Sequence, residues 1–168
     1  MVDLPGGLAR FNGATPEDAL ATAMSCAAVP RWAREVTAGR PYPVVAAALE
    51  RARVAAVPFT DDEVDAALAR HPRIGQRPTT DGRDAEHSRR EQAGVGHDPE
   101  LARRLEEGNR RYEDRFGHVF LIRAAGRDAA QILAALEERL GNDPATERRV
   151  AAEQLREIAV LRLEGELS

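Results

Sequence analysis

The chain has 168 residues, a formal net charge of −4 and a single cysteine, Cys26. A chain of this length buries roughly two-thirds of its unfolded surface, so we expect one domain over residues 1–168. One cysteine excludes an internal disulfide, which favours a reducing, cytoplasmic location. No apolar run approaches the roughly 20 residues of a membrane helix, and the N-terminus lacks the plan of a signal peptide. We therefore expect no membrane association.

All 24 basic residues are arginines, because the sequence contains no lysine. This absence excludes a lysine Schiff base, covalently held pyridoxal phosphate and a phosphate-loop lysine. Basic and acidic residues are mixed along the chain, whereas a nucleic-acid surface normally carries a basic excess on one face. We therefore expect no nucleic-acid partner.

Apolar residues recur at helical spacing through nearly the whole chain, which predicts an all-α fold of about seven to eight helices. Thr15 and Pro16 are typical of a helix start, and Thr60 with Glu63 forms a predicted capping box. In the first half, the predicted helices cover residues 15–26, 31–37, 43–58 and 60–71.

The second half of the chain shows similar helix start and stop signals after a stretch rich in glycine and proline. Gly117 ends a long predicted helix, and the apolar run Val119–Ile122 that follows is consistent with a buried extended segment. The predicted helices here cover residues 85–95, 99–116, 128–140 and 143–164.

The heptapeptide HPRIGQR at residues 71–77 is the first candidate for a site. Pro72 ends a helix and restricts His71 to extended backbone, so the imidazole could be held rigidly. A histidine at a helix end is also an ordinary cap, and spacing alone favours that reading. Ser88, Glu91 and Gln92 share one helical stripe, either as site residues or as a solvated face.

Two other interpretations remain open from the residues. His87 and Glu91 lie four apart, with His71 and His97 within reach in sequence, which would suit a metal-dependent hydrolase. Zinc sites usually show a tighter pair of ligands, and Cys26 has no cysteine partner. The same features could also be caps and packing in a helical binding protein without enzymatic activity.

Several segments in order and spacing resemble the OHCU decarboxylase family over nearly the whole chain. They are FNGATPEDA, CAAVPRWAREVTAGRPY, HPRIG, SRREQAGV, NRRYEDRFGHVFLIRAAGR, and RLGNDPATERRV through LRLEGEL. The family decarboxylates 2-oxo-4-hydroxy-4-carboxy-5-ureidoimidazoline to S-allantoin in urate catabolism. The resemblance implies a compact all-α bundle, a homodimer, and catalysis without a metal or other cofactor.

The resemblance also implies roles for individual residues. His71 matches the catalytic histidine, Glu91 the essential glutamate, and Arg162 a functional arginine of the last helix. The implied substrate-binding residues are Pro72, Ser88, Arg89, Arg90, Gln92, Phe120, Leu121, Ile122, Arg123 and Ala124. Arg123 stands where the family often has cysteine or alanine. Arg148, Arg149 and Arg156 lie on the same helix as Arg162 and are alternatives to it.

Overall fold

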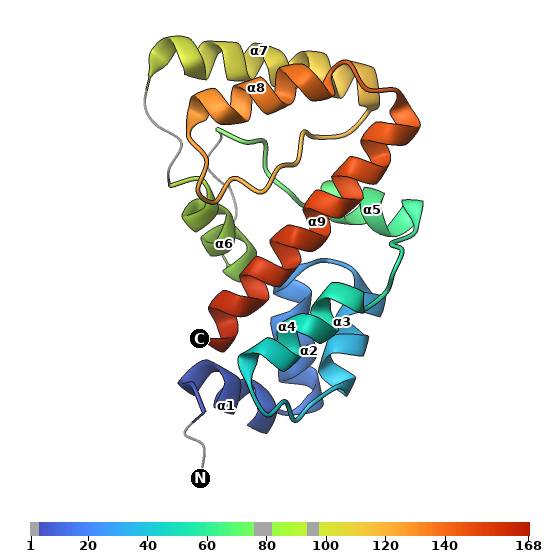
Figure 1. The fold of residues 1–168 in the computed structure, drawn as a ribbon, viewed down its shortest axis with the longest axis vertical. Coiled ribbons are helices and arrows are strands. Elements are labelled where there is room, and N and C mark those ends of the chain that lie inside the picture. The colour runs from blue at the N-terminus through green and yellow to red at the C-terminus, as the bar shows by residue number, and fades with distance from the viewer. Residues whose placement is uncertain (1–3, 76–81, 94–97) are drawn as a thin grey trace. The chain divides into compact units, whose positions relative to one another are not determined.

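A computed structural model describes residues 4–75, 82–93 and 98–168 of the chain (Figure 1). Its helices are α1 (Gly6–Gly13), α2 (Pro16–Cys26), α3 (Pro30–Ala38), α4 (Val45–Val54), α5 (Asp61–Leu68), α6 (Arg83–Glu91), α7 (Pro99–Phe116), α8 (Ala129–Arg139) and α9 (Pro144–Leu167). These described ranges contain nine helices and no strand, so the all-α prediction is confirmed with one helix more than expected. None of these helices is both long and apolar enough to span a membrane.

The predicted helix starts and stops are present in the structure. The Thr15 side chain accepts from the Asp18 amide at 3.1 Å, at the start of α2. Thr60 and Glu63 form the reciprocal capping box before α5. Gly117 ends α7 in the left-handed conformation, with φ of 77°, which glycine adopts without a steric penalty.

Several helices differ from the prediction at their ends, such as α4, which ends at Val54 and not at residue 58, and one was not predicted at all. Helix α1 was not expected, because it opens with two glycines and its N-cap, Pro5, offers no side-chain acceptor. Helix α6 ends at Glu91, whereas the predicted helix continued to Val95, a residue outside the described part of the chain.

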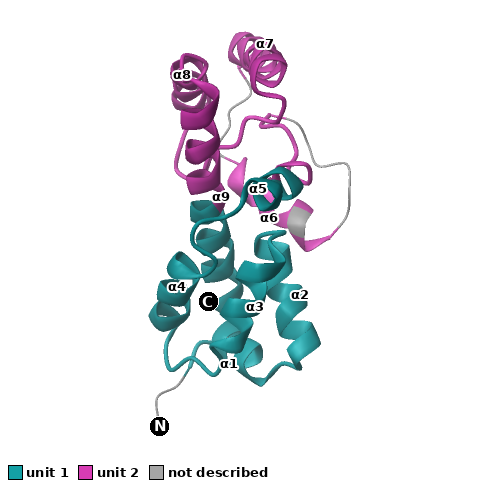
Figure 2. Cartoon of the chain, turned by 90° about the vertical axis from the view of Figure 1, so that its right-hand side faces the viewer, with its two compact units in different colours: residues 1–67, 156–168 teal, residues 68–155 magenta. Residues whose placement is uncertain are grey.

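The chain divides into two compact units (Figure 2). Unit 1 contains residues 1–67 and 156–168, and unit 2 contains residues 68–155. Helix α9 contributes its first part to unit 2 and its second part to unit 1. The single domain expected over residues 1–168 stays a prediction.

Unit 1 is built on the packing of α3 against α2 and α4. Trp32 of α3 is fully buried and donates its indole N–H to the Ala52 carbonyl of α4 at 2.9 Å. Cys26 at the end of α2 is also fully buried, as expected for a structural cysteine. These contacts give unit 1 a core of its own.

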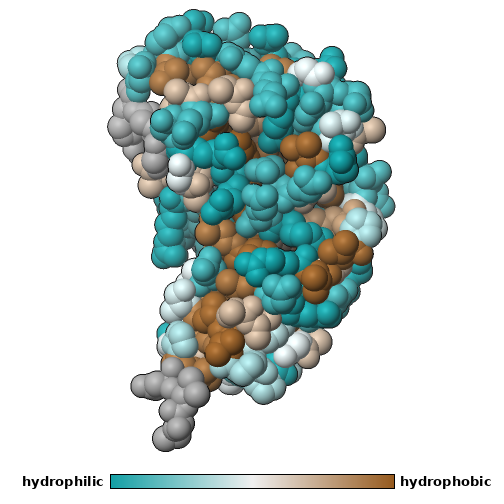
Figure 3. Space-filling view, viewed as in Figure 1, coloured by the Kyte–Doolittle hydropathy of each residue, from teal (hydrophilic) through white to brown (hydrophobic). Residues whose placement is uncertain are grey.

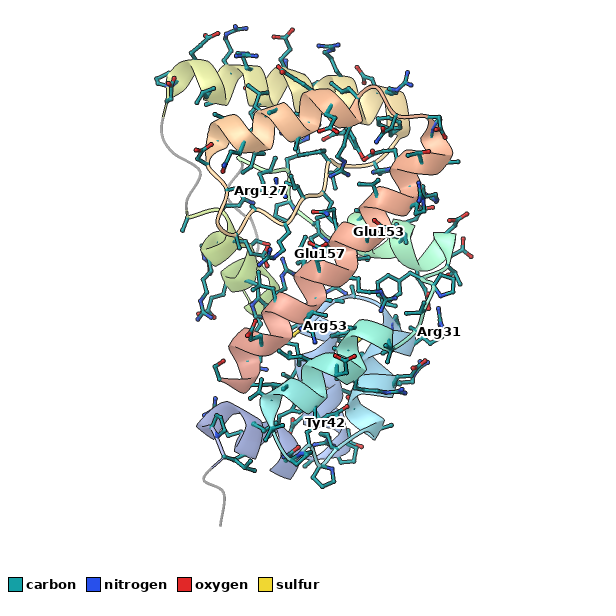
Figure 4. All side chains as sticks on the ribbon, in the orientation of Figure 1. Arg31, Tyr42, Arg53, Arg127, Glu153 and Glu157 are labelled. Carbon is teal, nitrogen blue, oxygen red and sulfur yellow. The ribbon has the colours of Figure 1, made fainter. Side chains whose placement is uncertain are left out.

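The loop between α4 and α5 is held by two arginines of unit 1. Arg31, labelled in Figure 4, donates to the Pro58 carbonyl at 2.8 Å and binds Glu63 through two further hydrogen bonds. Arg156 donates to the Ala55 carbonyl at 2.6 Å and lies 4.0 Å from the centroid of the Phe59 ring. The guanidinium of Arg156 is therefore already used in holding this loop.

Unit 2 is built on α7 and α8, which lie side by side (Figure 1, Figure 2). Gly108 of α7 permits this approach, because a Cβ there would lie 2.6 Å from Leu136 Cδ2. The buried cluster comprises Ile74, Leu105, Tyr112, Phe120, Ile122, Ala124, Ile132, Leu133 and Leu136. The outer side of α7 is mostly hydrophilic in Figure 3 and carries ion pairs such as Arg103 with Glu107. The 71–75 corner and the 120–124 segment thus share one core.

Candidate active site

The HPRIG corner begins where α5 ends. The His71 amide donates to the Leu68 carbonyl at 3.1 Å, which closes a last turn before the proline. Pro72 has no amide hydrogen and cannot extend the helix. Both His71 and Pro72 are half-buried. The imidazole therefore comes from a short, sharply bounded segment and not from a regular helix.

The rest of the corner is bonded to other parts of unit 2. The Arg73 guanidinium binds the Glu113 carboxylate of α7 through two hydrogen bonds, one of them 2.6 Å from Nε to Oε1. The Ile74 carbonyl accepts from Asn109 Nδ2 of α7 at 3.1 Å. The Gly75 amide donates to Gln92 Oε1 at 2.9 Å, next to the end of α6.

Helix α6 carries the predicted stripe. Ser88 is buried, and Glu91 and Gln92 are half-buried. The bond between Gly75 and Gln92 brings the end of this stripe to the HPRIG corner. Sequence reasoning expected His71 to turn toward this stripe, and the structure joins the two segments through these neighbouring residues.

The two arginines of the same segment lie differently. Arg89 and Arg90 are exposed, and the Arg90 guanidinium binds Glu86 on its own helix at 2.7 Å. An exposed pair four residues apart is typical of a solvated helix face. The substrate-binding role that the resemblance implies for Arg89 and Arg90 stays a prediction.

The segment Phe120–Ala124 has no regular secondary structure, and its Phe120, Ile122 and Ala124 lie in the buried cluster of unit 2. Phe120, Leu121, Ile122 and Ala124 are buried, while Arg123 is exposed. The backbone is fixed at two points: Arg139 donates to the Leu121 carbonyl at 2.7 Å, and the Arg123 amide donates to Gln154 Oε1 at 2.9 Å. With its side chain exposed, Arg123 leaves the buried face of this segment apolar.

A buried ionic network supports the same segment. Glu147 of α9 is fully buried and accepts from Arg139 Nε at 2.8 Å, from Asn142 Nδ2 at 2.9 Å and from the Tyr112 hydroxyl. The Arg139 guanidinium also lies over the Phe120 ring, 4.6 Å from its centroid. Burial, followed by the hydrogen bond to Glu147, raises the pKa of the Tyr112 phenol. The network ties α7, α8 and α9 to the backbone of Leu121.

The sequence pattern of the OHCU decarboxylase family matches residues 12–164 of the chain. The chain belongs to this family. It is 39% identical over 97 residues to the 2-oxo-4-hydroxy-4-carboxy-5-ureidoimidazoline decarboxylase of Amia calva, covering 56% of this chain and 55% of that protein. It is 34% identical over 101 residues to the uric acid degradation bifunctional protein TTL of Arabidopsis thaliana, covering 58% of this chain and 31% of that protein. The matched region thus spans about half or less of these curated relatives.

A solved structure described as OHCU decarboxylase in the presence of (S)-allantoin has a similar fold. It is 26% identical, the match covers 89% of this chain and 96% of that one, and the TM-score is 0.70. Family membership and fold therefore agree with the resemblance that the sequence motifs suggested.

The resemblance implies a functional arginine on the last helix, and Arg162 is the candidate. Arg162 is only 6% exposed and belongs to unit 1. Of the alternatives named from the sequence, Arg148 is half-buried, Arg149 is exposed and Arg156 binds the carbonyl groups after α4. Arg162 is the most buried of these four residues, and its functional role stays a prediction.

The metal hypothesis depended partly on His97, which lies outside the described residues. Within the described ranges, no three or more His, Cys, Asp or Glu side chains are grouped so that they could hold a metal ion. His87, the first of the suggested ligands, is buried.

Sequence reasoning missed the residues that support the site. Arg73, Asn109, Glu113, Arg139 and Glu147 were not singled out, although all lie in the motifs that carried the resemblance. The available signal was the spacing of Asn109 and Glu113, which places both on one face of a helix. The sequence alone gave no sign of which segment that face contacts.

Proposed function

We propose that this chain decarboxylates 2-oxo-4-hydroxy-4-carboxy-5-ureidoimidazoline to S-allantoin in urate breakdown, without a metal or other cofactor. The proposal is carried by the family match over residues 12–164, combined with a half-buried His71 in a segment bonded to the end of the α6 stripe. The curated relatives named above, which act on this substrate or in uric acid degradation, support the same reaction class.

The substrate's own structure supplies the electron sink. Its ring carbon 4 bears the carboxylate and a hydroxyl group, and carbon 5 bears the ureido group and forms a C=N bond. When the bond from carbon 4 to the carboxylate breaks, its electron pair forms a double bond between carbons 4 and 5, the π pair of the C=N bond moves onto the ring nitrogen, and carbon dioxide leaves. The ring nitrogen and carbon 5 each gain a proton, and the hydroxyl group loses one to become a carbonyl. The net uptake of one proton takes the place of the departing carbon dioxide, so atoms and charge balance without an oxidant or a lysine imine.

His71 is the proposed proton donor to carbon 5. An imidazole has an ordinary pKa near 6.5, so it can both hold and release a proton around neutral pH. Delivery from one fixed side of a flat intermediate gives a single product enantiomer, and that requires a rigid donor. Glu91 is proposed to orient His71 or to accept the proton of the substrate hydroxyl.

The remaining site residues are proposed to bind and orient the substrate. Ser88 and Gln92 offer neutral partners for the ureido and ring amides, and the segment Phe120–Ala124 offers an apolar wall with backbone groups. Arg162 is proposed to bind a ring carbonyl or the carboxylate with its planar fork. Tight binding of the departing carboxylate would stabilise the ground state more than the transition state. This favours the ring carbonyl as the partner of Arg162.

We further propose that the chain works as a homodimer in a reducing, cytoplasmic compartment. The family resemblance supports the dimer, and the single buried cysteine suits a reducing compartment. Light scattering coupled to size-exclusion chromatography tests the oligomeric state, and a monomer at assay concentrations would contradict the dimer.

The activity is tested by generating the substrate from urate with a urate oxidase and a hydroxyisourate hydrolase, the two preceding enzymes that the family resemblance implies, and by following circular dichroism of the product. We expect the chain to accelerate formation of optically active S-allantoin. Decay to racemic allantoin at the same rate with and without the chain would refute the proposed function. Loss of activity after exhaustive chelation, restored by added metal, would instead favour the alternative function, a metal-dependent hydrolase of a related ureide.

His71→Asn and Glu91→Gln test the individual roles. Glu91→Gln should lower the rate by the roughly 10²- to 10⁴-fold typical of a positioned acid or base. Glu153→Gln, an exposed position labelled in Figure 4, is the matched control and should keep the wild-type rate. An unchanged yield of S-allantoin with His71→Asn would refute the proton-donor role.

A further inference from the structure

One face of α7 makes three contacts that the proposed reaction does not use directly. Asn109, Tyr112 and Glu113 stand at spacings of three and four residues, so their side chains project from the same side of the helix. Tyr112 binds Glu147 in the core. Asn109 and Glu113 both bind the HPRIG corner, at consecutive residues of it.

The contact between Glu113 and Arg73 fixes an orientation as well as a position. Arg73 donates from Nε and from a terminal nitrogen to the two carboxylate oxygens, so the planar groups face each other. The two side chains are 34% and 21% exposed, which shields the pair partly from water. A lysine in place of Arg73 could not make this two-point contact.

Asn109 holds the next residue of the corner. Its side chain is buried, and Nδ2 donates to the Ile74 carbonyl at 3.1 Å. Its Oδ1 atom is buried and has no hydrogen-bond partner among the described residues. Burying this acceptor without a partner lowers the stability of the fold. An apolar residue would avoid that cost, which indicates that the bond to Ile74 is what the position provides.

These anchors confine the two residues between them. On one side, the His71 amide is bonded to Leu68 at the end of α5, and on the other side Arg73, Ile74 and Gly75 are each bonded to α7 or Gln92. Along the chain, only Pro72 separates Arg73 from His71. A displacement of the Arg73 backbone therefore reaches the His71 backbone across a single residue, about 3.8 Å per Cα–Cα step. The proline ring fixes one of the backbone dihedrals on that path.

We propose that Asn109 and Glu113 are positioning residues that set the placement of the His71 imidazole through Ile74 and Arg73. The inference rests on the proposed function for its catalytic consequence. A misplacement of about 1 Å at a reacting group can cost roughly 10²-fold in rate. Loss of the Glu113 contact should therefore reduce kcat without removing any group that touches the substrate.

Glu113→Gln is the decisive variant, because its partly exposed side chain can lose its charge while the core packing remains. We expect kcat to fall by about tenfold to a hundredfold, with KM changed far less. Glu107→Gln is the matched control: Glu107 lies on the same helix and pairs with the exposed Arg103 at 3.3 Å, away from the corner. It should retain the wild-type kcat.

A charge swap separates positioning from direct participation. The double variant Arg73→Glu with Glu113→Arg restores an ion pair between the same two positions, so it should recover much of the kcat that Glu113→Gln loses. If the swap is no better than either single change, Arg73 or Glu113 acts in another way and the inference fails. Asn109→Asp removes the donor to Ile74 and should lower kcat in the same manner, provided its thermal unfolding stays cooperative.

The position of the imidazole is measured independently of activity by NMR of labelled histidine, with the His71 signals assigned through His71→Asn. We expect the His71 ring signals to shift in Glu113→Gln, to stay in place in Glu107→Gln and to return in the charge swap. Unchanged His71 signals in Glu113→Gln would overturn the inference. If the wild-type chain makes no S-allantoin, the proposed function fails, but the NMR comparison still decides whether α7 sets the imidazole.

Discussion

Replacing Glu147 by glutamine should be among the most destabilising conservative changes in unit 2. Glu147 is fully buried and compensates the charge of Arg139, whose side chain is only 9% exposed. Glutamine keeps the volume, removes the negative charge and turns an N–H₂ group toward the neighbouring donors. Removing one partner of a buried ion pair typically costs about 3–5 kcal/mol, because the other charge is left uncompensated.

That loss is large against the roughly 5–15 kcal/mol that stabilises a typical protein. At about 2–4 °C per kcal/mol for a chain of this size, Tm should fall by roughly 6–20 °C. With an m-value near 2 kcal/mol/M in urea, the midpoint should fall by about 1.5–2.5 M. Urea titration followed by far-ultraviolet circular dichroism measures both the midpoint and m.

Glu107→Gln again provides the comparison, because its ion pair with Arg103 is exposed and should contribute less than about 1 kcal/mol. A fall in the urea midpoint of less than about 0.5 M for Glu147→Gln would refute the reasoning, since Arg139 would then not depend on Glu147 for its charge. Because Arg139 also holds the Leu121 carbonyl, activity should fall together with stability.

Three further changes test other contacts. The hydrogen bond from Arg31 lowers the pKa of Glu63 below its ordinary 4.5, so the stability it contributes is present above that pH and is lost as pH falls through the lowered value. The difference in unfolding free energy between wild type and Glu63→Gln should therefore shrink in acid. Burial raises the pKa of both tyrosines, Tyr42 and Tyr112, above 10.0, so ultraviolet absorbance should show little tyrosinate at pH 10 until urea unfolds the chain. The stability linked to these phenols is present below pH 10 and is lost as pH rises through the raised values. Arg156→Lys cannot span the carbonyls after α4 and should cost about 1–2 kcal/mol in urea unfolding.

Local chemistry explains why most helices were predictable from the sequence. Thr15, Thr60 and Gly117 act within three or four residues of themselves, and each cap is formed in the structure as the pattern predicted. Helix α1 was not predicted because its start has no capping side chain and its first residues, Gly6 and Gly7, have low helix propensity. The helix buries Leu8 and Phe11, and such packing against distant residues cannot be predicted from the local sequence.

The supporting contacts of the site were not predictable for a different reason. Arg73 and Glu113 are 40 residues apart, in a chain with 24 arginines and 28 acidic residues. Composition and spacing permit a great many such pairs, and only the fold selects one. The HPRIG corner and the stripe could be predicted because their residues are close in sequence and chemically unusual. Arg73, which holds the corner, has no sequence feature that distinguishes it from the other arginines.

The absence of lysine has a structural consequence beyond the chemistry that it excludes. Four arginines each donate to the main-chain carbonyl of a residue outside the helices while also making a second contact: Arg31, Arg40, Arg139 and Arg156. Arg40, for example, bonds the carbonyls of Phe11 and Ala14 at 2.6 and 2.9 Å with one nitrogen. A guanidinium has five donors in a planar fork, so one side chain can fix two segments, whereas an ammonium group acts as a point charge. Hydrogen bonds from arginine side chains to main-chain carbonyls therefore connect loops to helices in both units. The segment 120–124 is held by a bond of the same kind, from Arg139 to the Leu121 carbonyl.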